Sequence, residues 1–312
     1  MNSKKRLGKG LEDISHLFLS GSSSSPVRAH SSVQKRAEGP RLERTVRLAL
    51  SLVPRPPSAF FTANLGVELA RAGRRVLAIE TAPLPSLDEV LGSVRIQPSL
   101  SDLLEQPEKQ LTVEGPLGMK ILSFQLRSEE LQGFAVEEQE ILSQVLRKEE
   151  EEAELVLIHA VYGENDVFQK WVGAVQGAVL TVDLNSETLL QTYQVCKHLY
   201  HLNPDLRIGL IVFGNHDRET AAAGMKRLSD AVVQFLGKTL EWYGIIPDDP
   251  LIERSLAAKV SLTVLDQSSK TALGFSVAAR NLLQGIEKNP GRLSSSGSFF
   301  GRLQHTADLV EG

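Results

Sequence analysis

Short apolar runs alternate along most of this chain with longer segments in which apolar residues recur every three or four positions. The runs at residues 155–158 and 207–213 are almost entirely apolar, which is typical of strands that are buried on both faces of a sheet. The longer segments have the spacing of amphipathic helices. We expect strands at residues 45–52, 75–79, 119–123, 155–158, 178–182, 207–213 and 240–246, and helices at residues 63–72, 101–106, 137–152, 186–199, 219–236 and 268–286.

The alternation of buried strands with helices favours one fold class. Parallel strands need crossover connections, and helices that make those crossovers cover both faces of the sheet. We therefore predict an α/β fold, doubly wound, with a mostly parallel sheet flanked by helices on both faces. The folded domain is expected to span residues 43–286 of the 312.

The two ends of the chain have a different composition. Residues 1–42 are basic and rich in serine, and residues 287–312 contain a second serine-rich run. Such segments bury too little apolar surface to offset the entropy lost on ordering. We expect both to be flexible tails.

Each tail contains one apolar feature. Leu11, Ile14 and Leu17 or Phe18 recur at helical spacing within residues 11–19, so this short amphipathic segment is a candidate for docking on a partner protein. The alternatives are that it folds back on its own domain or stays disordered. In the other tail, Phe299 with its neighbour Phe300 could insert at a membrane surface, but so few cations lie nearby that we expect at most peripheral membrane contact.

Composition and charge exclude several kinds of protein. The formal net charge of −4 gives no reason to expect a specific nucleic-acid partner. The single cysteine, Cys196, excludes a disulfide framework and indicates a small buried residue. The histidines lack the spacing of zinc ligands, so no metal site is predicted. There is neither a signal peptide nor an apolar run long enough to span a membrane, and we expect a cytoplasmic protein.

Several segments, in a consistent order, resemble the MinD/ParA/FlhG family of SIMIBI-class P-loop ATPases. The sequence NLGVELARAGRRVL at residues 64–77 is similar to that family's first helix and second strand. Residues 86–92 and 99–104 are similar to the segments that follow. The sequence FLGKTLEWYGIIPDD at residues 235–249 resembles the flagellar-number regulator branch, in which a helix ends in a glycine turn and a short strand leads to a Pro-Asp loop. The resemblance covers roughly residues 45–285 and implies the predicted fold.

The resemblance also implies where a phosphate-binding loop would lie. The family has a glycine-rich loop with two lysines after its first strand, whereas residues 51–59 read SLVPRPPSA. Pro54, Pro56 and Pro57 lack the N–H groups that cradle phosphates. Ser58 stands where the family has its main lysine, and Ala59 where a hydroxyl would hold Mg²⁺.

Two further positions depart from the family's pattern. After the second strand the family has two aspartates, where this chain has Glu80 and Ala82. After the strand at residues 155–158 it has an aspartate near magnesium, where this chain has His159. With these ingredients of phosphoryl transfer missing, we expect a degenerate member that lacks the Walker A motif, with no nucleotide cofactor, no catalytic residue and no enzyme activity.

Glu80 and His159 have competing interpretations. Both are expected at the carboxyl ends of strands, where open α/β sheets bind ligands. They could hold a ligand or form a proton-transfer pair, or they could be remnants of a decayed pocket, which we favour. Arg55 is interpreted as a solvated loop residue, and the pair Asp248 and Asp249 as part of a turn. The four glutamates at residues 149–152 are interpreted as a solvated helix end.

The function that follows is that of a non-catalytic pseudo-ATPase. We expect a regulator or scaffold for the position or number of a cell-surface apparatus, with the flagellum as the first guess. Its partner would be a protein, either an active paralogue or a component of the apparatus, and a homo- or heterodimer is plausible. One alternative is a nucleotide-binding ATPase whose unconventional phosphate site uses Arg55, Ser58, Glu80 and His159. Another is an accessory protein of a secretion or polysaccharide-assembly system.

Overall fold

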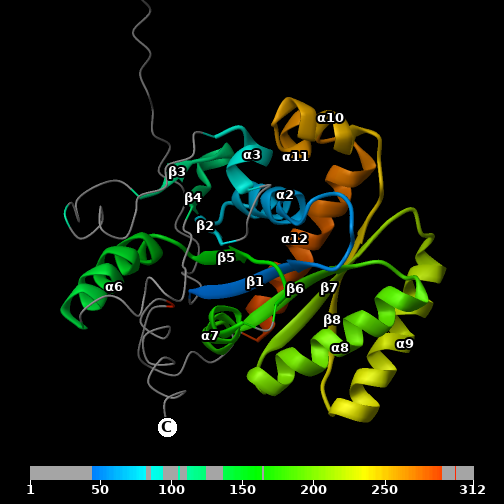
Figure 1. Cartoon of the computed structure of the whole chain (residues 1–312). Helices are drawn as coiled ribbons and strands as arrows, with labels where there is room; N and C mark the ends of the chain where they lie inside the picture. Colours follow the sequence, from blue (N-terminus) through cyan, green and yellow to red (C-terminus); the bar gives the residue numbers. More distant parts are fainter. Residues whose placement is uncertain are drawn as a thin grey trace, which may run out of the picture. The chain divides into compact units, whose positions relative to one another are not determined.

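The computed structural model describes residues 44–81, 86–93, 111–123, 136–163 and 165–289, together with residues 105 and 299. Within these residues the strands form one eight-stranded sheet (Figure 1). The strands are β1 (Thr45–Ser51), β2 (Val76–Glu80), β3 (Val113–Glu114), β4 (Lys120–Ser123), β5 (Leu155–His159), β6 (Gly177–Val182), β7 (Arg207–Phe213) and β8 (Leu240–Ile246).

The sheet has the order β3-β4-β2-β5-β1-β6-β7-β8. All neighbouring strands are parallel except β3, which pairs antiparallel with β4. After β1 the chain first forms the strands on one side of it, β2 to β5, and then the strands on the other side, β6 to β8. The direction in which strands are added to the sheet therefore reverses at β1. The carboxyl ends of β1, β2 and β5 therefore meet at a topological switch point, the place where doubly wound sheets bind ligands.

Helices cover both faces of this sheet (Figure 1). The α2 and α12 helices pack on one face, with α10 and α11 beside them, and α7 and α8 pack on the other face with α9. The described helices are α2 (Ser58–Arg71), α3 (Leu87–Leu91), η1 (Pro116–Gly118), α6 (Val136–Glu151), α7 (Asp166–Ala174), α8 (Ser186–Leu202), α9 (Arg218–Leu236), α10 (Leu251–Ala258), α11 (Leu262–Leu265) and α12 (Lys270–Lys288).

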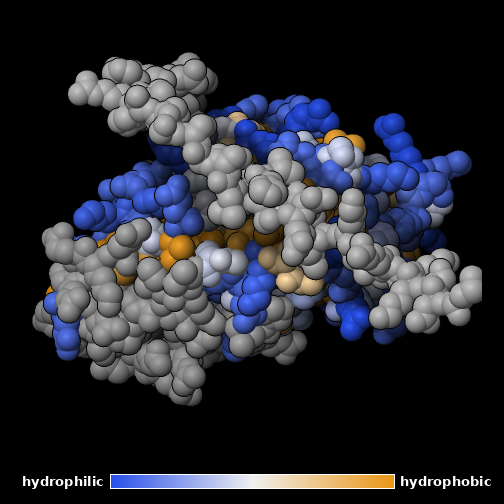
Figure 2. All heavy atoms as spheres, turned by 90° about the horizontal axis from the view of Figure 1, so that it is seen from above, coloured by the Kyte–Doolittle hydropathy of each residue, from blue (hydrophilic) through white to orange (hydrophobic). Residues whose placement is uncertain are grey.

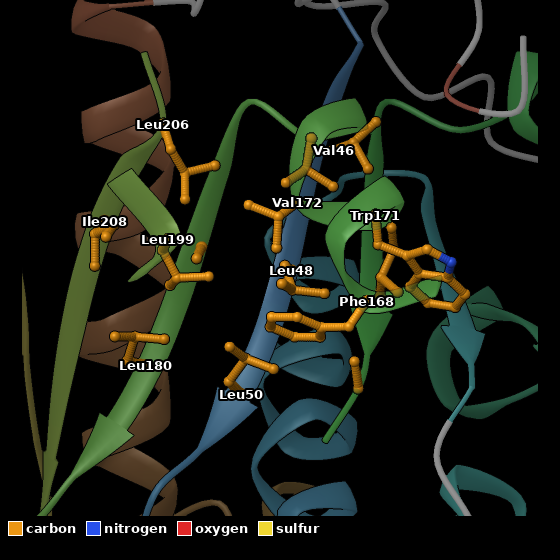
Figure 3. Packing of buried hydrophobic residues seen from close by; sticks show 14 of the residues in the cluster. Val46, Leu48, Leu50, Phe168, Trp171, Val172, Leu180, Leu199, Leu206 and Ile208 are labelled. Carbon is orange, nitrogen blue, oxygen red and sulfur yellow. The ribbon is translucent and has the colours of Figure 1, made fainter. Parts of the chain in front are cut away.

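Alternation along each strand divides the core into two apolar layers. In β5, Val156 and Ile158 belong to the layer beneath α7 and α8, whereas Leu155 and Leu157 belong to the layer beneath α2 and α12. Successive strand side chains point to opposite faces, so a strand that is apolar at every position supplies both layers. Figure 3 shows the first layer, in which side chains of β1 lie against those of α7. Full burial stabilises each large apolar side chain by roughly 1.5–3 kcal/mol.

The predicted strands and the fold class are confirmed. The β7 and β8 strands have the predicted bounds, 207–213 and 240–246, and the other predicted strands differ by one residue at one or both ends. The sequence patterns missed β3, α3, η1, α7, α10 and α11, which are short and therefore have too few turns or alternations to show a period. The α2 helix begins at Ser58 rather than at residue 63. The predicted helix at residues 101–106 lies almost wholly outside the described residues.

Cys196 lies in α8 and is fully buried, as the sequence predicted. Burial raises the pKa of its thiol from 9.0 to about 12. At pH 8 the folded protein then holds roughly a thousandfold less thiolate than the unfolded chain, and only the thiolate is nucleophilic. We expect iodoacetamide to modify Cys196 roughly a thousandfold more slowly in buffer than in denaturant, measured by intact mass. Full modification within minutes of a protein that keeps its circular dichroism spectrum would contradict this burial.

The glutamates at the end of α6 are not a freely solvated helix end. Glu150 is buried and accepts hydrogen bonds from Arg44 Nη1 at 3.4 Å and from the backbone N–H of Phe299 at 2.7 Å. Lys120 Nζ lies 3.4 Å from Glu149 Oε2 and 2.5 Å from Glu152 Oε2. These contacts correct the sequence-based interpretation, because cations far away in sequence are brought to this helix only by the fold.

Phe299 also differs from what its sequence context indicated. Its side chain is buried, and its ring packs edge-on against Trp171 of α7 with the ring centroids 6.4 Å apart. A side chain held in this way is not presented to a membrane surface. Phe300 lies outside the described residues.

No described helix is both long and apolar enough to cross a membrane. Figure 2 shows that the described residues on one face are mostly hydrophilic, with small hydrophobic areas among them.

Candidate functional site

The turn between β1 and α2 occupies the place where the sequence comparison put a phosphate-binding loop. Its first residue, Leu52, is held by a hydrogen bond from its N–H to the carbonyl of Thr181. Pro54 and Arg55 are exposed, whereas Pro56 is buried, and the peptide bond between Arg55 and Pro56 is cis. Pro57 then stands at the N-cap of α2, to which its side chain gives no hydrogen bond.

Ser58 and Ala59 are the first two residues of α2. Proline at the N-cap presets the backbone angle with which the chain enters the helix. Ala59 is fully buried beneath the turn, whereas Ser58 is half-buried. The hydroxyl of Ser58 is therefore placed at the carboxyl edge of the sheet, above the ends of β2 and β5.

Glu80 and His159 are the last residues of β2 and β5 and lie directly beside one another in the strand register. Only 1% of Glu80 and 0% of His159 is exposed to solvent. A carboxylate or an imidazole is costly to bury unless its polar atoms are hydrogen-bonded. Their burial therefore requires partners within the protein.

Those partners form one continuous chain of hydrogen bonds. Ser58 Oγ lies 2.8 Å from His159 Nε2, and His159 Nδ1 lies 2.7 Å from Glu80 Oε1. The second carboxylate oxygen, Glu80 Oε2, accepts a hydrogen bond from the backbone N–H of Leu87 at 2.7 Å. We call Ser58, His159 and Glu80 the polar triad.

The direction of these hydrogen bonds depends on the tautomer of His159. With Glu80 ionised and His159 neutral, Nδ1–H of His159 donates a hydrogen bond to the carboxylate, which can only accept. Nε2 then has a lone pair that accepts a hydrogen bond from the hydroxyl of Ser58. Thr81 adds a further restraint, because its Oγ1 donates to the carbonyl of His159 at 2.7 Å.

The α3 helix is positioned to supply the N–H that Glu80 needs. Ser86 caps this helix by accepting from the N–H of Glu89 at 3.4 Å. Asp88, also buried, accepts from Ser123 Oγ at the end of β4 and from Ser93 Oγ at 3.0 Å. These bonds fasten α3 over the ends of β2 and β4.

A cavity of about 460 Å³ lies against the same turn. Asp249 accepts from the N–H of Leu251 at 2.9 Å, so this residue shapes a turn as predicted. The cavity wall carries three carboxylates and one guanidinium. Its lining residues are Arg55, Pro56, Phe213, Asn215, Asp248, Asp249, Pro250, Ile252 and Glu253.

The structure therefore brings together three of the residues singled out from sequence, Ser58, His159 and Glu80. Arg55 does not join them: it is exposed and makes no hydrogen bond within the described part of the chain, as expected of a solvated loop residue. Ala82 and the residues of the segment 11–19 lie outside the described residues. Among those described, no group of three or more His, Cys, Asp or Glu side chains is arranged to hold a metal ion.

The sequence offered one signal that pointed to this arrangement. A hydroxyl, an imidazole and a carboxylate replace the family's residues at three positions that all lie at one edge of the sheet. The sequence allowed Glu80 and His159 as a proton-transfer pair, or with Ser58 and Arg55 as an unconventional phosphate site, but remnants of a decayed pocket were favoured. The contact of His159 with Ser58, which is 101 residues away in the chain, is the part that it missed.

Comparison with known proteins agrees with this fold. No family model matches the chain. The antiactivator FleN of Pseudomonas aeruginosa is 21% identical over 222 residues, which cover 70% of this chain and 79% of that relative.

Solved structures share the fold over about three quarters of the chain. A chain of the MinC–MinD cell division protein complex of Aquifex aeolicus superimposes with a TM-score of 0.59 at 22% identity, covering 77% of this chain and 96% of that one. A ParA family ATPase of Chlorobium tepidum gives 0.58 at 16% identity, covering 77% and 99%. The MinD protein of Pyrococcus horikoshii, solved with Mg-ADP, gives 0.54 at 21% identity, covering 78% and 99%. From its sheet order and these similarities, the chain has the fold of the MinD and ParA ATPases and is similar in sequence to the antiactivator FleN.

Proposed function

We propose that this protein is a pseudo-ATPase, a regulator that keeps the fold of a nucleotide switch but does not bind or hydrolyse ATP. The observation that carries the proposal is the polar triad. Its side chains stand where the resembled family has a lysine and two aspartates, and they bond to one another. No phosphate or magnesium is needed to satisfy them.

The turn before α2 supports this proposal. A phosphate loop works by pointing successive backbone N–H groups at the phosphate oxygens. Pro54, Pro56 and Pro57 have no N–H, so three of the donors that such a loop needs are missing. Arg55 between them is a single exposed cation.

The residues that would meet Mg²⁺ fit it poorly. Magnesium is held by carboxylate, hydroxyl and water oxygens in near-octahedral geometry. Ala59 offers no hydroxyl and is fully buried. His159 is an imidazole whose two ring nitrogens are already engaged, by Ser58 and by Glu80.

We expect no measurable binding of Mg-ATP or Mg-ADP to the full-length protein. At 1 mM nucleotide, a dissociation constant of 10 μM would stabilise the fold by about 2.7 kcal/mol, whereas one of 1 mM or weaker contributes at most about 0.4 kcal/mol. Calorimetric titration and thermal denaturation with and without Mg²⁺ measure the difference. The Pyrococcus horikoshii MinD, whose structure holds Mg-ADP, is the positive control. Magnesium-dependent binding in the micromolar range would instead support an ATPase with an unconventional phosphate site.

The regulatory half of the proposal rests on the relatives. One relative is an antiactivator, and a structural neighbour comes from a complex of two cell division proteins. We therefore assign this chain a cytoplasmic role in placing or numbering a cell-surface apparatus, the flagellum first. It acts by binding an active paralogue or a component of the apparatus, as a homo- or heterodimer and with at most peripheral membrane contact.

The N-terminal segment 11–19 is the proposed docking element. Leu11, Ile14, Leu17 and Phe18 would form its apolar face, and a helix this short needs a partner surface to be stable. Substituting Ile14→Asp places a charge on that face. Loss of a co-purified partner in the I14D variant, with an unchanged melting temperature, supports this assignment.

Deletion of the gene distinguishes the flagellar role from a role in secretion or polysaccharide assembly. We expect an altered number or position of flagella, restored by the wild-type gene and not by I14D. Normal flagella together with a defect in secretion or polysaccharide assembly would place the protein in one of those systems instead.

A further inference from the structure

The polar triad has the connectivity of a nucleophile, a base and an orienting acid. In such an arrangement a hydroxyl bonds to an imidazole, whose second nitrogen bonds to a carboxylate. Here the two distances are 2.8 and 2.7 Å, within the range of well-formed hydrogen bonds. The three residues come from α2, β5 and β2, so the fold itself assembles them.

Burial changes along the triad in the direction that such a site needs. Glu80 and His159 are enclosed, and the second oxygen of Glu80 is held by the N–H of Leu87, which limits rotation of the carboxylate. Ser58 is the one member of the triad that is not fully buried. Burial therefore decreases from the orienting acid to the residue that carries the hydroxyl.

An acyl-transfer site also has to stabilise the negative charge of an oxyanion, and the N-terminus of a helix, where Ser58 lies, favours negative charge. Ser58 is the first residue of a fourteen-residue helix whose N-cap, Pro57, contributes no side-chain hydrogen bond. First-turn amides of a helix point outward along its axis and carry partial positive charge. In acyl-transfer enzymes the backbone N–H of the residue after the nucleophile donates to the oxyanion, and in this chain that residue is Ala59, the second residue of α2.

We propose that Ser58 is the nucleophile of an acyl-transfer site whose substrate is a carboxylic ester. Ser58 Oγ bonds to the carbonyl carbon while its proton passes to His159 Nε2. The ester C–O bond then breaks, and the alcohol leaves with that proton. Water adds to the acyl-serine through the same base, releasing the carboxylic acid and restoring the hydroxyl. Glu80 acts as a positioning residue that holds the required tautomer of His159.

A fluorophosphonate tests this proposal on the full-length protein. Its phosphorus bonds to an activated serine as fluoride leaves, so the adduct is detected by mass spectrometry of peptides. We expect a single adduct on Ser58. Ser186 is a matched control within the same molecule, because it is also the first residue of a helix and is more exposed but has no imidazole partner among the described residues.

Three variants distinguish a Ser58 hydroxyl that is activated by His159 and Glu80 from a set of hydrogen bonds that only stabilises the fold. Ser58→Ala removes the adduct. His159→Gln removes the base and should lower the labelling rate by at least about a hundredfold, within the usual contribution of general-base catalysis. In the Glu80→Gln variant the amide oxygen can still accept from the N–H of Leu87. The amide nitrogen, however, donates a hydrogen bond to Nδ1 of His159, so the ring proton moves to Nε2. We expect E80Q to slow labelling about 10²- to 10⁴-fold at an unchanged melting temperature, the size of effect known for the wrong tautomer in serine proteases.

Several outcomes would overturn the proposal. One is an unlabelled Ser58 after prolonged exposure to 1 mM fluorophosphonate that modifies a control hydrolase. Equal labelling of Ser58 and Ser186 is another, because the probe would then react with any accessible serine. An E80Q variant that labels as fast as the wild type would show that the triad only holds the strand ends together. None of these results depends on whether ATP binds.

Discussion

Replacing Phe275 by alanine is expected to lower the free energy of unfolding by about 3–5 kcal/mol, as large-to-small substitutions in a packed core do. Phe275 lies in α12 with 0% of its surface exposed. Its ring packs edge-on against Phe60, with centroids 5.7 Å apart, and at a tilt against Phe61 at 6.4 Å. Removing the ring leaves a cavity between two helices that cannot close without moving both.

This cluster also stabilises the site. Phe60 and Phe61 lie in the first turn of α2, two and three residues after Ser58, and Phe61 contacts Phe213 of β7 with centroids 5.2 Å apart. Urea denaturation of F275A measures the loss. Leu273→Ala in the same helix is the control, because Leu273 is 55% exposed and its truncation is expected to change stability by about 0.5 kcal/mol or less. A loss below 1 kcal/mol for F275A would mean that the aromatic packing is wrong.

Replacing Glu80 by alanine is expected to lower the free energy of unfolding by about 2–5 kcal/mol. The substitution leaves two buried donors without their acceptor: the Nδ1–H of His159 and the N–H of Leu87. Each unsatisfied buried group costs about 1–3 kcal/mol, and the truncated side chain adds a small void. The loss should appear as a lower denaturation midpoint with an unchanged slope.

Glu80→Gln is the matched control for this prediction. Its amide oxygen can accept from Leu87, and its amide nitrogen can donate to His159, so both contacts survive. We expect E80Q to lie within about 1 kcal/mol of the wild type. If E80A and E80Q were equally stable, the buried hydrogen bonds at the ends of β2 and β5 would contribute nothing to the fold.

The candidate site was predicted only as a set of positions. The motif order placed Ser58, Glu80 and His159 at one edge of the sheet, because local patterns mark where each strand ends. It could not join them, since a hydrogen bond between residues 101 positions apart depends on the angle of α2 over β5 and on one rotamer. His159 and Glu80 were therefore interpreted as remnants of a decayed pocket.

The sequence by itself determined the fold class and where most of the buried strands lie along the chain, and it places three prolines, with neither glycine nor lysine, at residues 51–59. These properties rest on local chemistry: apolar runs form buried strands, amphipathic spacing forms helices, and proline has no N–H to offer a phosphate. The tertiary structure alone decided which polar groups satisfy one another. It bonded Ser58 to His159 and Glu80, and it buried Glu150 and Phe299 where the sequence indicated exposed ends. Burial and hydrogen bonding depend on what the fold brings within about 3 Å, a distance that no local pattern of residues records.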